Sequence, residues 1–334
     1  MGKISNFGLR FFFIYRAEKS YISSKKIVKK EKICYNRGER LLSFENRFSA
    51  YRDFTREETF DFSKKSSIGL GGKAEICFCP QSLTELSALL GMLERDNIEY
   101  YVLGNLTNVL PSDAGTRKAI VCLKNLKEMI FSERVFAYAG VQASAFVNAC
   151  KKARLSGAEF LCGIPCTIGG ALFMNAGAGD KYIDSIVDSV LVYRQGGLTL
   201  YSQKDCQYAY KSSVFMQDGS VIIGAHFALN QASLDEIEKR EEYYRKRRKH
   251  LPKGRSMGCV FKNPQGRSAG ELIEKSGLKG LRIGGAFVSE EHANFIINGG
   301  DATASDVKKL IHLIKNAVYA QYGVYLEEEI QYLT

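Results

Sequence analysis

The sequence predicts an α+β fold in two parts, preceded by a basic extension. A strand–helix–strand pattern spans residues 74–103, and β-rich segments separated by Gly-Gly and Asp-Gly turns follow between Ile186 and Leu229. Pro252 then breaks a charged helix, and a shorter set of helical and extended segments comes after it. With 334 residues, 45% hydrophobic and 25% charged, the chain has the composition of a soluble globular protein of two or three domains.

Most of the positive charge lies in residues 1–44. These residues contain eleven Lys/Arg and three Asp/Glu, a balance of +8, so only +3 of the formal net charge of +11 falls on the remainder. We predict a poorly ordered basic extension here, with a membrane-surface or targeting role as the alternative. The rest of the chain is not basic enough to indicate a nucleic-acid-binding protein.

The cysteines and apolar runs indicate a cytoplasmic location. Nine cysteines are scattered without a CxxC pair or a zinc-like spacing with the four histidines, so we expect reduced, mostly buried thiols and no metal site. No apolar run approaches the length of a membrane span. The segment Phe11–Tyr15 is short and flanked by arginines, which is unlike the core of a signal peptide.

The first part consists of short elements. Ala74–Cys79 and Ile98–Leu103 are expected to be strands. Between them, Ser82-Leu-Thr-Glu85 has the pattern of a capping box and opens an amphipathic helix that reaches about Asp96. The elements expected next are a strand over Val135–Gly140, a helix over Ala143–Leu155 ended by Gly157, and strands over Ile186–Tyr193, Leu198–Tyr201 and Val221–Leu229.

A glycine-rich stretch over Gly163–Gly177 separates that helix from the β-rich segments. Its glycines permit tight turns and close approach of the backbone to a ligand. Such a backbone can present N–H groups to an anion or to the edge of a flat heterocycle. Glycine spacing alone is equally typical of a plain connection in a β-rich domain.

The second part is expected to begin with a charged helix over Leu234–Lys249. Its last residues, Arg245-Lys-Arg-Arg-Lys249, suit a solvated helix end. The elements expected after it are a helix over Ser268–Ser276 capped by Gly277, a helix over Ser305–Tyr322 ended by Gly323, and a final strand over Val324–Tyr332. Strand alternation would place Glu327 and Glu329 on one face of that strand and Glu328 on the other.

The stretch Gly163–Gly177 resembles the flavin-binding segment of the UDP-N-acetylenolpyruvoylglucosamine reductases, enzymes of bacterial cell-wall precursor synthesis. The resemblance extends from about Asp61 to the C-terminus, and several motifs in order are far more specific than any one of them. The further motifs are Ser67–Gly72, Leu103–Leu110, Tyr210–Phe215, Gly258–Pro264, Gly277–Ala286, His292–Asn298 and Leu326–Ile330. The short separation of Tyr210 and Gly258 resembles the shorter type of the family, so another group must cover the substrate in place of the longer type's loop.

The resemblance implies both a fold and an activity. The expected fold is an FAD-binding domain of the vanillyl-alcohol-oxidase/PCMH type over residues 45–229, followed by a smaller α+β substrate-binding domain over residues 230–334, whose last strand returns to the active site. The expected activity is that of an FAD-dependent, NADPH-driven oxidoreductase, which reduces UDP-N-acetylglucosamine enolpyruvate to UDP-N-acetylmuramate for peptidoglycan. The expected partners are the UDP-sugar and NADPH, without nucleic acid or membrane insertion, and the expected state is a monomer or weak oligomer.

The resemblance also implies the cofactor-binding residues. In the family, the turn that corresponds to Gly104–Asn108 wraps the pyrophosphate of the dinucleotide. Most relatives have a second glycine and a serine where Leu106 and Thr107 stand; Thr107 keeps the hydroxyl, while Leu106 puts the close backbone approach in question. The residues expected to bind FAD are Gly104, Asn105, Leu106, Thr107, Asn108, Gly163, Ile164, Pro165, Thr167, Gly169, Gly170, Asn175, Ala176 and Gly177.

Three residues are candidates for catalysis. Cys259 stands where most relatives have the serine that donates a proton, and a thiol, with a reference pKa of about 8.5, is a plausible substitute. Lys211 stands where the family has an arginine for the substrate carboxylate; lysine keeps the charge but loses the two-pronged grip. Glu329 corresponds to a glutamate that orients or shares the proton. The plainer alternatives are a buried cysteine, a surface lysine and a solvated strand.

Tyr210 and Asn263 correspond to substrate-binding positions, although an Asn-Pro turn explains Asn263 equally well. His292 is either part of a family motif or a packed histidine. The cationic run at Arg245–Lys249 is either a solvated helix end or a contact to the diphosphate of the sugar nucleotide or to NADPH. Two other functions stay open, a related FAD oxidase and a non-catalytic flavin-binding homologue. The absence of histidine in the two predicted flavin loops argues against an oxidase with a tethered flavin.

Overall fold

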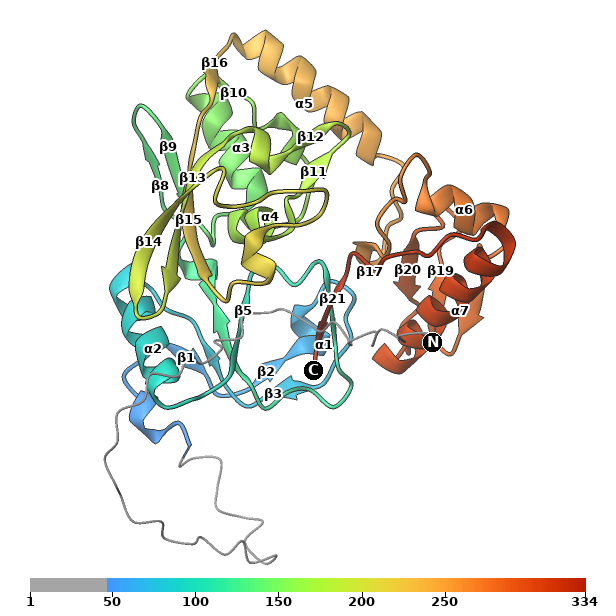
Figure 1. The fold of residues 1–334 in the computed structure, drawn as a ribbon, viewed down its shortest axis with the longest axis horizontal. Helices are drawn as coiled ribbons and strands as arrows, with labels where there is room; N and C mark the ends of the chain where they lie inside the picture. The colour runs from blue at the N-terminus through green and yellow to red at the C-terminus, as the bar shows by residue number, and fades with distance from the viewer. Residues whose placement is uncertain (1–46) are drawn as a thin grey trace, which may run out of the picture.

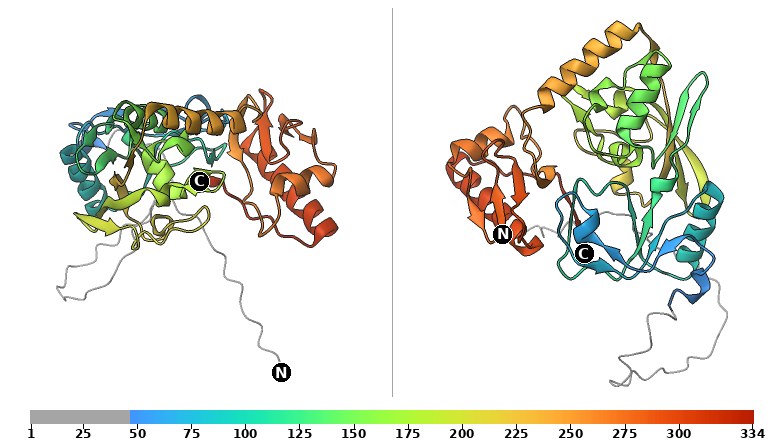
Figure 2. Two further views of the ribbon diagram at one scale, coloured as in Figure 1. Left: turned by 90° about the horizontal axis from the view of Figure 1, so that it is seen from above. Right: turned by 180° about the vertical axis from the view of Figure 1, so that it is seen from behind.

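The structure, a computed structural model, describes residues 47–334, and the predicted extension over residues 1–44 lies outside them. A larger lobe holds the chain up to about residue 231, and a smaller lobe holds most of the remainder (Figure 1). Helix α5 (Leu234–Arg248) runs along the larger lobe and leads into the smaller one. The two further views show the smaller lobe attached to one side of the larger (Figure 2). No helix among residues 47–334 is both long and apolar enough to cross a membrane.

The larger lobe contains a four-stranded sheet in the order β1 (Arg56–Glu57), β4 (Cys77–Phe78), β7 (Ala119–Cys122) and β5 (Tyr100–Leu103). Strands β4, β7 and β5 are parallel to one another, and α2 (Leu83–Arg95) connects β4 to β5. The single strand predicted over residues 74–79 is two strands, because β3 (Lys73–Ala74) pairs instead with β2 (Phe60–Asp61).

The predicted start of α2 is confirmed, but its cap differs from the expected one. The Ser82 side chain accepts a hydrogen bond from the Glu85 N–H, as a helix cap does. The Glu85 carboxylate does not return to Ser82; it accepts from the N–H groups of Thr55 and Gln81 at 2.7 Å and 2.6 Å. The glutamate therefore fastens the helix to the residue before β1 instead of closing a capping box.

A second, antiparallel sheet of five strands carries the glycine-rich stretch on one face. Its order is β14 (Gly197–Ser202), β13 (Val187–Arg194), β15 (Val221–Phe227), β9 (Val135–Tyr138) and β8 (Met129–Phe131). Helix α4 (Ile168–Met174), formed by that stretch, contacts β9 and β15. Helix α3 (Ala143–Lys152) ends earlier than predicted, because Arg154 adopts a left-handed backbone with φ of 55° and β10 (Leu155–Ser156) then pairs with β16 (Asn230–Gln231).

The smaller lobe is a four-stranded antiparallel sheet covered by helices. The strand order is β17 (Arg255–Cys259), β20 (Phe295–Asn298), β19 (Ala286–Val288) and β18 (Arg282–Ile283). Helix α6 (Ala269–Lys275) packs on α7 (Ala304–Tyr322), which contacts β18 and β19. Gly323 ends α7 with a φ of 66°, as predicted.

The end of the chain joins the two lobes. Of the strand predicted over Val324–Tyr332, only β21 (Gln331–Leu333) forms, and it pairs in parallel with β6 (Val109–Pro111) of the larger lobe. Just before it, the Glu329 N–H donates to the Val260 carbonyl at 2.8 Å, beside β17 of the smaller lobe. One short segment thus contacts both lobes (Figure 1).

The remaining elements are short. The strands are β11 (Gly177–Ala178) and β12 (Lys181–Tyr182), and the helices are α1 (Phe62–Lys65) and the 3₁₀ turns η2 (Ser49–Tyr51), η3 (Leu123–Asn125), η4 (Glu159–Leu161), η5 (Ile183–Ser185) and η6 (Val214–Met216).

Candidate active site

A cavity of ≈ 750 Å³ lies where the two lobes meet, and most of the predicted site residues line it. The larger lobe contributes the loop after β5 and the glycine-rich stretch, and the smaller lobe contributes residues around β17. Cys259, Lys211 and Glu329 all line it, as do Tyr210 and Asn263. Of the residues predicted to bind FAD, only Gly163 and Asn175 do not line this cavity.

The loop after β5 offers backbone donors to an anion. The N–H groups of Asn105, Leu106 and Thr107 have no acceptor among the described residues. Leu106 adopts a left-handed backbone with φ of 52°, where most relatives are expected to have glycine, and its side chain is buried in a cluster with Leu103 and Val109. Successive N–H groups around a left-handed residue form the kind of concavity that binds phosphate oxygens. The leucine therefore leaves the backbone available, and its side chain packs in the core.

Close packing explains the glycines around this loop. A Cβ on Gly104 would lie 2.4 Å from the Thr167 Oγ1, so glycine is what lets the two loops touch. A Cβ on Gly169 would lie 2.8 Å from the Ala139 Cβ, and one on Gly177 would lie 2.2 Å from the Lys181 carbonyl oxygen. Together with the free N–H groups, this narrow cradle of backbone fits the pyrophosphate and flat ring of FAD.

Two of the predicted cofactor residues position the loops through their side chains. The Asn105 side chain donates to Gln142 and to the Pro165 carbonyl, and it accepts from the Gln142 Nε2 at 2.9 Å. Thr167 caps α4 by accepting from the Gly170 N–H at 3.2 Å. The side chains of Asn105 and Thr167 are thus already engaged within the protein.

Asn175 also has a structural position. It ends α4 in a left-handed conformation with φ of 45° and is 2% exposed. Its side-chain amide donates to Asp184 at 3.2 Å and to the Ala209 carbonyl at 3.0 Å, and its Oδ1 accepts from the Asp184 N–H at 3.2 Å. These bonds join α4 to the turn that presents Lys211.

Three elements bring the candidate catalytic residues together. Cys259 ends β17 after an irregular pairing at Gly258, whose φ is 77°. Lys211 sits in a turn with a left-handed φ of 53°, and Glu329 precedes β21. The Lys211 Nζ lies 2.9 Å from the Glu329 Oε1, and the two side chains are only 18% and 13% exposed.

Burial and charge set the protonation states of this cluster. Burial alone would lower the pKa of Lys211, but the charge of Glu329 and its hydrogen bond outweigh this effect, so the Lys211 pKa is raised and the ammonium keeps its charge. Burial, followed by the Glu329 charge, raises the pKa of Cys259 to about 11, against the opposing charges of Lys211 and Arg248. The thiol is therefore protonated at neutral pH and less acidic than its reference value would suggest.

Each of the three adjacent glutamates has its own lysine. Glu327 lies 2.6 Å from Lys262, Glu328 lies 2.7 Å from Lys315, and Glu329 contacts Lys211. The expectation that strand alternation sorts them is wrong, because residues 324–330 do not form a regular strand. Glu327 is 73% exposed whereas Glu329 is 13% exposed. Low exposure, together with its contact to Lys211, therefore distinguishes Glu329 from Glu327.

Tyr210 and Asn263 are in contact with each other. The Asn263 N–H donates to the Tyr210 hydroxyl at 3.2 Å, and the Asn263 Oδ1 accepts from the Ala269 N–H at 3.0 Å. Tyr210 is exposed, and its ring lies edge-on to Tyr182 with centroids 6.1 Å apart. His292 also lines the cavity, and burial lowers its pKa, so the imidazole is mainly neutral at pH 7.

Among the further residues that line the cavity are three with polar side chains, Tyr182, Arg248 and Gln331. Arg248 belongs to the cationic run at the end of α5, where a solvated helix end and a ligand contact were both open. No sequence pattern marked Tyr182. Gln331 lies two positions after Glu329, and only the pairing of β21 with β6 brings it to the cavity.

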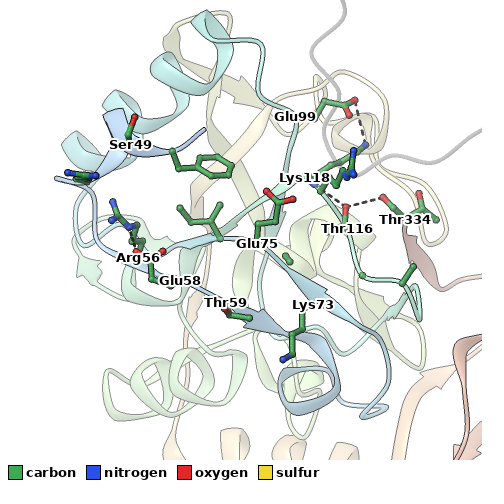
Figure 3. Close-up of a pocket in the computed structure, with 17 residues that line it drawn as sticks. Ser49, Arg56, Glu58, Thr59, Lys73, Glu75, Glu99, Thr116, Lys118 and Thr334 are labelled. Atoms are coloured by element: carbon green, nitrogen blue, oxygen red, sulfur yellow. Dashed lines mark hydrogen bonds and ion pairs between the residues drawn. The ribbon is translucent and has the colours of Figure 1, made fainter. Parts of the chain in front are cut away.

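A second cavity, of ≈ 1260 Å³, lies on the larger lobe beside Thr334 (Figure 3). Its lining carries both signs of charge, and several of these groups are paired, including Lys118 with Glu99 at 3.7 Å and Arg56 with Glu58 at 2.9 Å. None of the predicted catalytic residues lines it. We therefore regard the cavity between the lobes as the candidate active site.

Comparison with known protein families gives two matches along the chain. The model of the C-terminal domain of UDP-N-acetylenolpyruvoylglucosamine reductase matches residues 249–333. A model of an FAD-binding domain matches residues 74–200. Most residues that line the cavity lie in these two regions, whereas Tyr210, Lys211 and Arg248 lie between them.

Similar whole proteins agree with these matches. The UDP-N-acetylenolpyruvoylglucosamine reductase of Geobacter metallireducens is 40% identical over 273 residues, which cover 80% of this chain and 91% of that protein. The enzyme of the same name from Clostridioides difficile is 38% identical over 275 residues, covering 81% and 90%. The crystal structure of the reductase from Thermus caldophilus superposes with a TM-score of 0.74 at 31% identity, covering 84% of this chain and all of that one. The predicted fold class is confirmed.

Proposed function

The chain belongs to the UDP-N-acetylenolpyruvoylglucosamine reductase family of FAD-dependent oxidoreductases, and from this premise we propose that it reduces UDP-N-acetylglucosamine enolpyruvate to UDP-N-acetylmuramate with electrons from NADPH. The observation that carries the proposal is the contact of Lys211 with Glu329 in a cavity that the partly buried Cys259 also lines, together with a backbone cradle for FAD. A pair of groups for the substrate's carboxylate and its proton is what this reaction requires of the protein.

In the proposal, the loop after β5 and the glycine-rich stretch would hold FAD. The N–H groups of residues 105–107 would bind its pyrophosphate, while Gly104 and Gly169 would allow the backbone to approach it. When bound, FAD supplies the hydride chemistry, taking hydride from NADPH and passing it to the vinyl carbon of the substrate. Gly163 and Asn175 support the loops without facing the ligand.

The remaining chemistry falls to the protein. Negative charge develops on the substrate carboxylate and its neighbouring carbon, and the Lys211 ammonium, whose side chain is largely buried, stabilises it. The Cys259 thiol donates its proton to that carbon. Its raised pKa keeps the proton in place at neutral pH, and the Lys211 charge stabilises the thiolate that is left. Glu329 holds Lys211 in position and keeps it charged. Tyr210, Tyr182 and Asn263 form the wall that contacts the rest of the UDP-sugar.

We propose residues 45–229 as the FAD-binding domain and residues 230–334 as the substrate-binding domain. One core cluster whose buried members all lie within residues 48–227 supports this division, and a second cluster is formed mainly by residues 257–330, with Ile68, Leu70 and Leu110 of the first domain packed into it. The eight described cysteines are free thiols, which is what a reducing, cytoplasmic location favours. A monomer or weak oligomer stays the expected state.

An anaerobic titration of the purified protein with NADPH tests the proposal. We expect a yellow protein whose visible absorbance is bleached by NADPH and restored by stoichiometric UDP-N-acetylglucosamine enolpyruvate. A protein that NADPH does not bleach would be a non-catalytic homologue. One that oxygen reoxidises quickly and the UDP-sugar does not would be an oxidase.

A further inference from the structure

Arg248 occupies an unusual position in the last turn of α5. It lines the cavity together with Cys259 and Lys211, and its Nε donates to the Gly163 carbonyl at 3.0 Å. Gly163, with φ of 75°, has a role here that its sequence motif did not indicate. A Cβ on it would lie 3.2 Å from the Arg248 Cδ, so glycine leaves room for the arginine stem.

The three preceding cations of the same run contact side chains one helical turn back on α5. Arg245 contacts Glu241 at 3.4 Å and Lys246 contacts Glu242 at 2.9 Å, both one helical turn away. Arg247 donates to the Tyr243 hydroxyl at 3.2 Å and lies over the Tyr243 ring. Arg247 also lines the cavity and has no carboxylate partner among the described residues, but its side chain is exposed. Arg248 differs from all three neighbours because it is partly buried and contacts the Gly163 carbonyl.

The helix that carries Arg248 is fastened to the larger lobe. The Glu241 side chain is 2% exposed, and its Oε2 lies 3.2 Å from the Nζ of Lys151 on α3. Arg240 hydrogen-bonds to Ser156, and α5 packs on η4. These contacts fix the position of α5 on the larger lobe, and therefore the place of the Arg248 guanidinium in its last turn.

Lys211 alone does not provide the paired N–H donors that hold a substrate carboxylate best. Its ammonium is a single compact group and already contacts Glu329 at 2.9 Å, whereas a carboxylate is held best by two parallel N–H donors. We propose that Arg248 supplies this two-pronged grip for the enolpyruvyl carboxylate of the substrate, and so determines specificity for the enolpyruvyl UDP-sugar. The inference rests on the proposed function.

The choice of the carboxylate over the diphosphate follows from the position of the guanidinium. Arg248 lines the same cavity as Cys259, where the reacting carbon must lie for proton transfer, and the charge of Arg248 also acts on that thiol. The enolpyruvyl carboxylate is attached to that carbon, and the diphosphate lies at the other side of the sugar ring. A group near Cys259 is thus near the carboxylate.

Binding measured by calorimetry on the FAD-loaded protein separates these two ligands. UDP-N-acetylglucosamine has the diphosphate but no carboxylate, and UDP-N-acetylglucosamine enolpyruvate has both. For Arg248→Met we expect about 10²-fold weaker binding of the enolpyruvyl compound, the size of a lost charged hydrogen-bond pair, and less than twofold change for UDP-N-acetylglucosamine. Arg248→Lys should recover part of the affinity, and added guanidinium ion should recover part of it in Arg248→Met.

Lys249→Met is the matched control, since Lys249 is exposed and lies outside the cavity; it should bind both compounds as the wild type does. Unchanged FAD content and melting temperature in Arg248→Met show that the variant is folded. Equal weakening of both compounds would assign Arg248 to the diphosphate and overturn the inference, as would unchanged binding of both. If the wild type turns over the UDP-sugar in either case, the proposed function stands; a wild type that does not turn it over overturns both.

Discussion

The thiol of Cys259 is influenced by burial and by three charged side chains. Burial and Glu329 raise its pKa, while Lys211 and Arg248 oppose them. In the proposed reaction the same two cations would stabilise the thiolate that remains after proton transfer. Because the raised pKa of about 11 keeps the thiol protonated at physiological pH, the proposed donor would carry its proton there.

Replacing Cys259 tests this role. Cys259→Ser should remain active, since a serine hydroxyl has a similar reach and is the residue of most relatives. Cys259→Ala should lose roughly 10²-fold or more in turnover, the range expected for a positioned proton donor. Stopped-flow absorbance should show that bleaching by NADPH is nearly normal in the Ala variant, and that reoxidation by the UDP-sugar carries the defect. Normal turnover by Cys259→Ala would make Cys259 a core residue, with Glu329 the next candidate.

Alkylation supplies an independent check on the same residue. Only the thiolate reacts, and with a pKa of about 11 its fraction rises about tenfold with each pH unit below that value. Inactivation by a thiol-alkylating reagent should therefore be slow at pH 7 and accelerate steadily toward pH 10, with substrate giving protection. Cys259→Ser should be spared; equal inactivation of both proteins would point to one of the other cysteines.

For Lys211 we propose that the reaction requires the charge of the side chain and that arginine can replace lysine. Lys211→Arg should retain or improve turnover, because it keeps the charge beside Glu329. Lys211→Met should lose about 3 kcal/mol of transition-state stabilisation, or roughly 10²-fold in kcat, while FAD content is unchanged. The double variant Lys211→Met/Glu329→Gln controls for the uncompensated carboxylate. A normal kcat in Lys211→Met would remove this residue from the mechanism.

Several residues of the candidate site lie at the ends of helices and strands. Helix α4 ends at Asn175, whose amide joins it to the segments around Asp184 and Ala209. Helix α5 ends at Arg248, and β17 ends at Cys259. The cavity is therefore lined by element ends and the loops between them, and the conformation of each end depends on tertiary contacts more than on local propensity.

Asn175→Ala distinguishes a helix-ending role from a cofactor-binding role. The variant loses buried hydrogen bonds and places alanine in a left-handed conformation, so we expect a loss of about 2 kcal/mol in the free energy of unfolding. FAD affinity of the folded protein, measured by fluorescence titration, should change less than threefold, because Asn175 does not line the cavity. A large loss of FAD affinity without a loss of stability would restore the sequence-based interpretation.

At the scale of the whole molecule, sequence reasoning succeeded where signals are local. Capping residues and apolar periodicity located α2 and α7, and charged composition with the break at Pro252 located α5, each to within a residue or two. It failed over residues 324–330, whose partners are distant segments that no local pattern encodes. It could not separate Arg248 from its neighbours, because their difference lies in which groups they contact. The site residues were located by ordered motifs, and their mutual contacts came only with the fold.

The charge and pattern break before the first motif suggests that residues 1–44 are dispensable. Deleting them should leave FAD content and turnover nearly unchanged, as measured by the absorbance ratio of the purified protein and by NADPH consumption with the UDP-sugar. A truncated protein that loses FAD would show that this segment contributes to the fold.

The return of the chain end to the larger lobe makes the site sensitive to packing outside it. Leu333 is 1% exposed in a cluster with Val109 and Leu103, and it lies four residues after Glu329. Leu333→Ala should cost about 2–5 kcal/mol of stability. Strand β21 pairs with β6, and Asn108, directly before β6, donates its side-chain amide to the Glu329 carbonyl at 3.0 Å. Because these contacts hold Glu329 in place, kcat per bound FAD should also fall. Leu313→Ala, at a position 37% exposed on α7, makes the same chemical change and should affect neither quantity by much. If Leu333→Ala lowers the melting temperature but leaves kcat per FAD unchanged, β21 stabilises the lobes without aligning the catalytic pair.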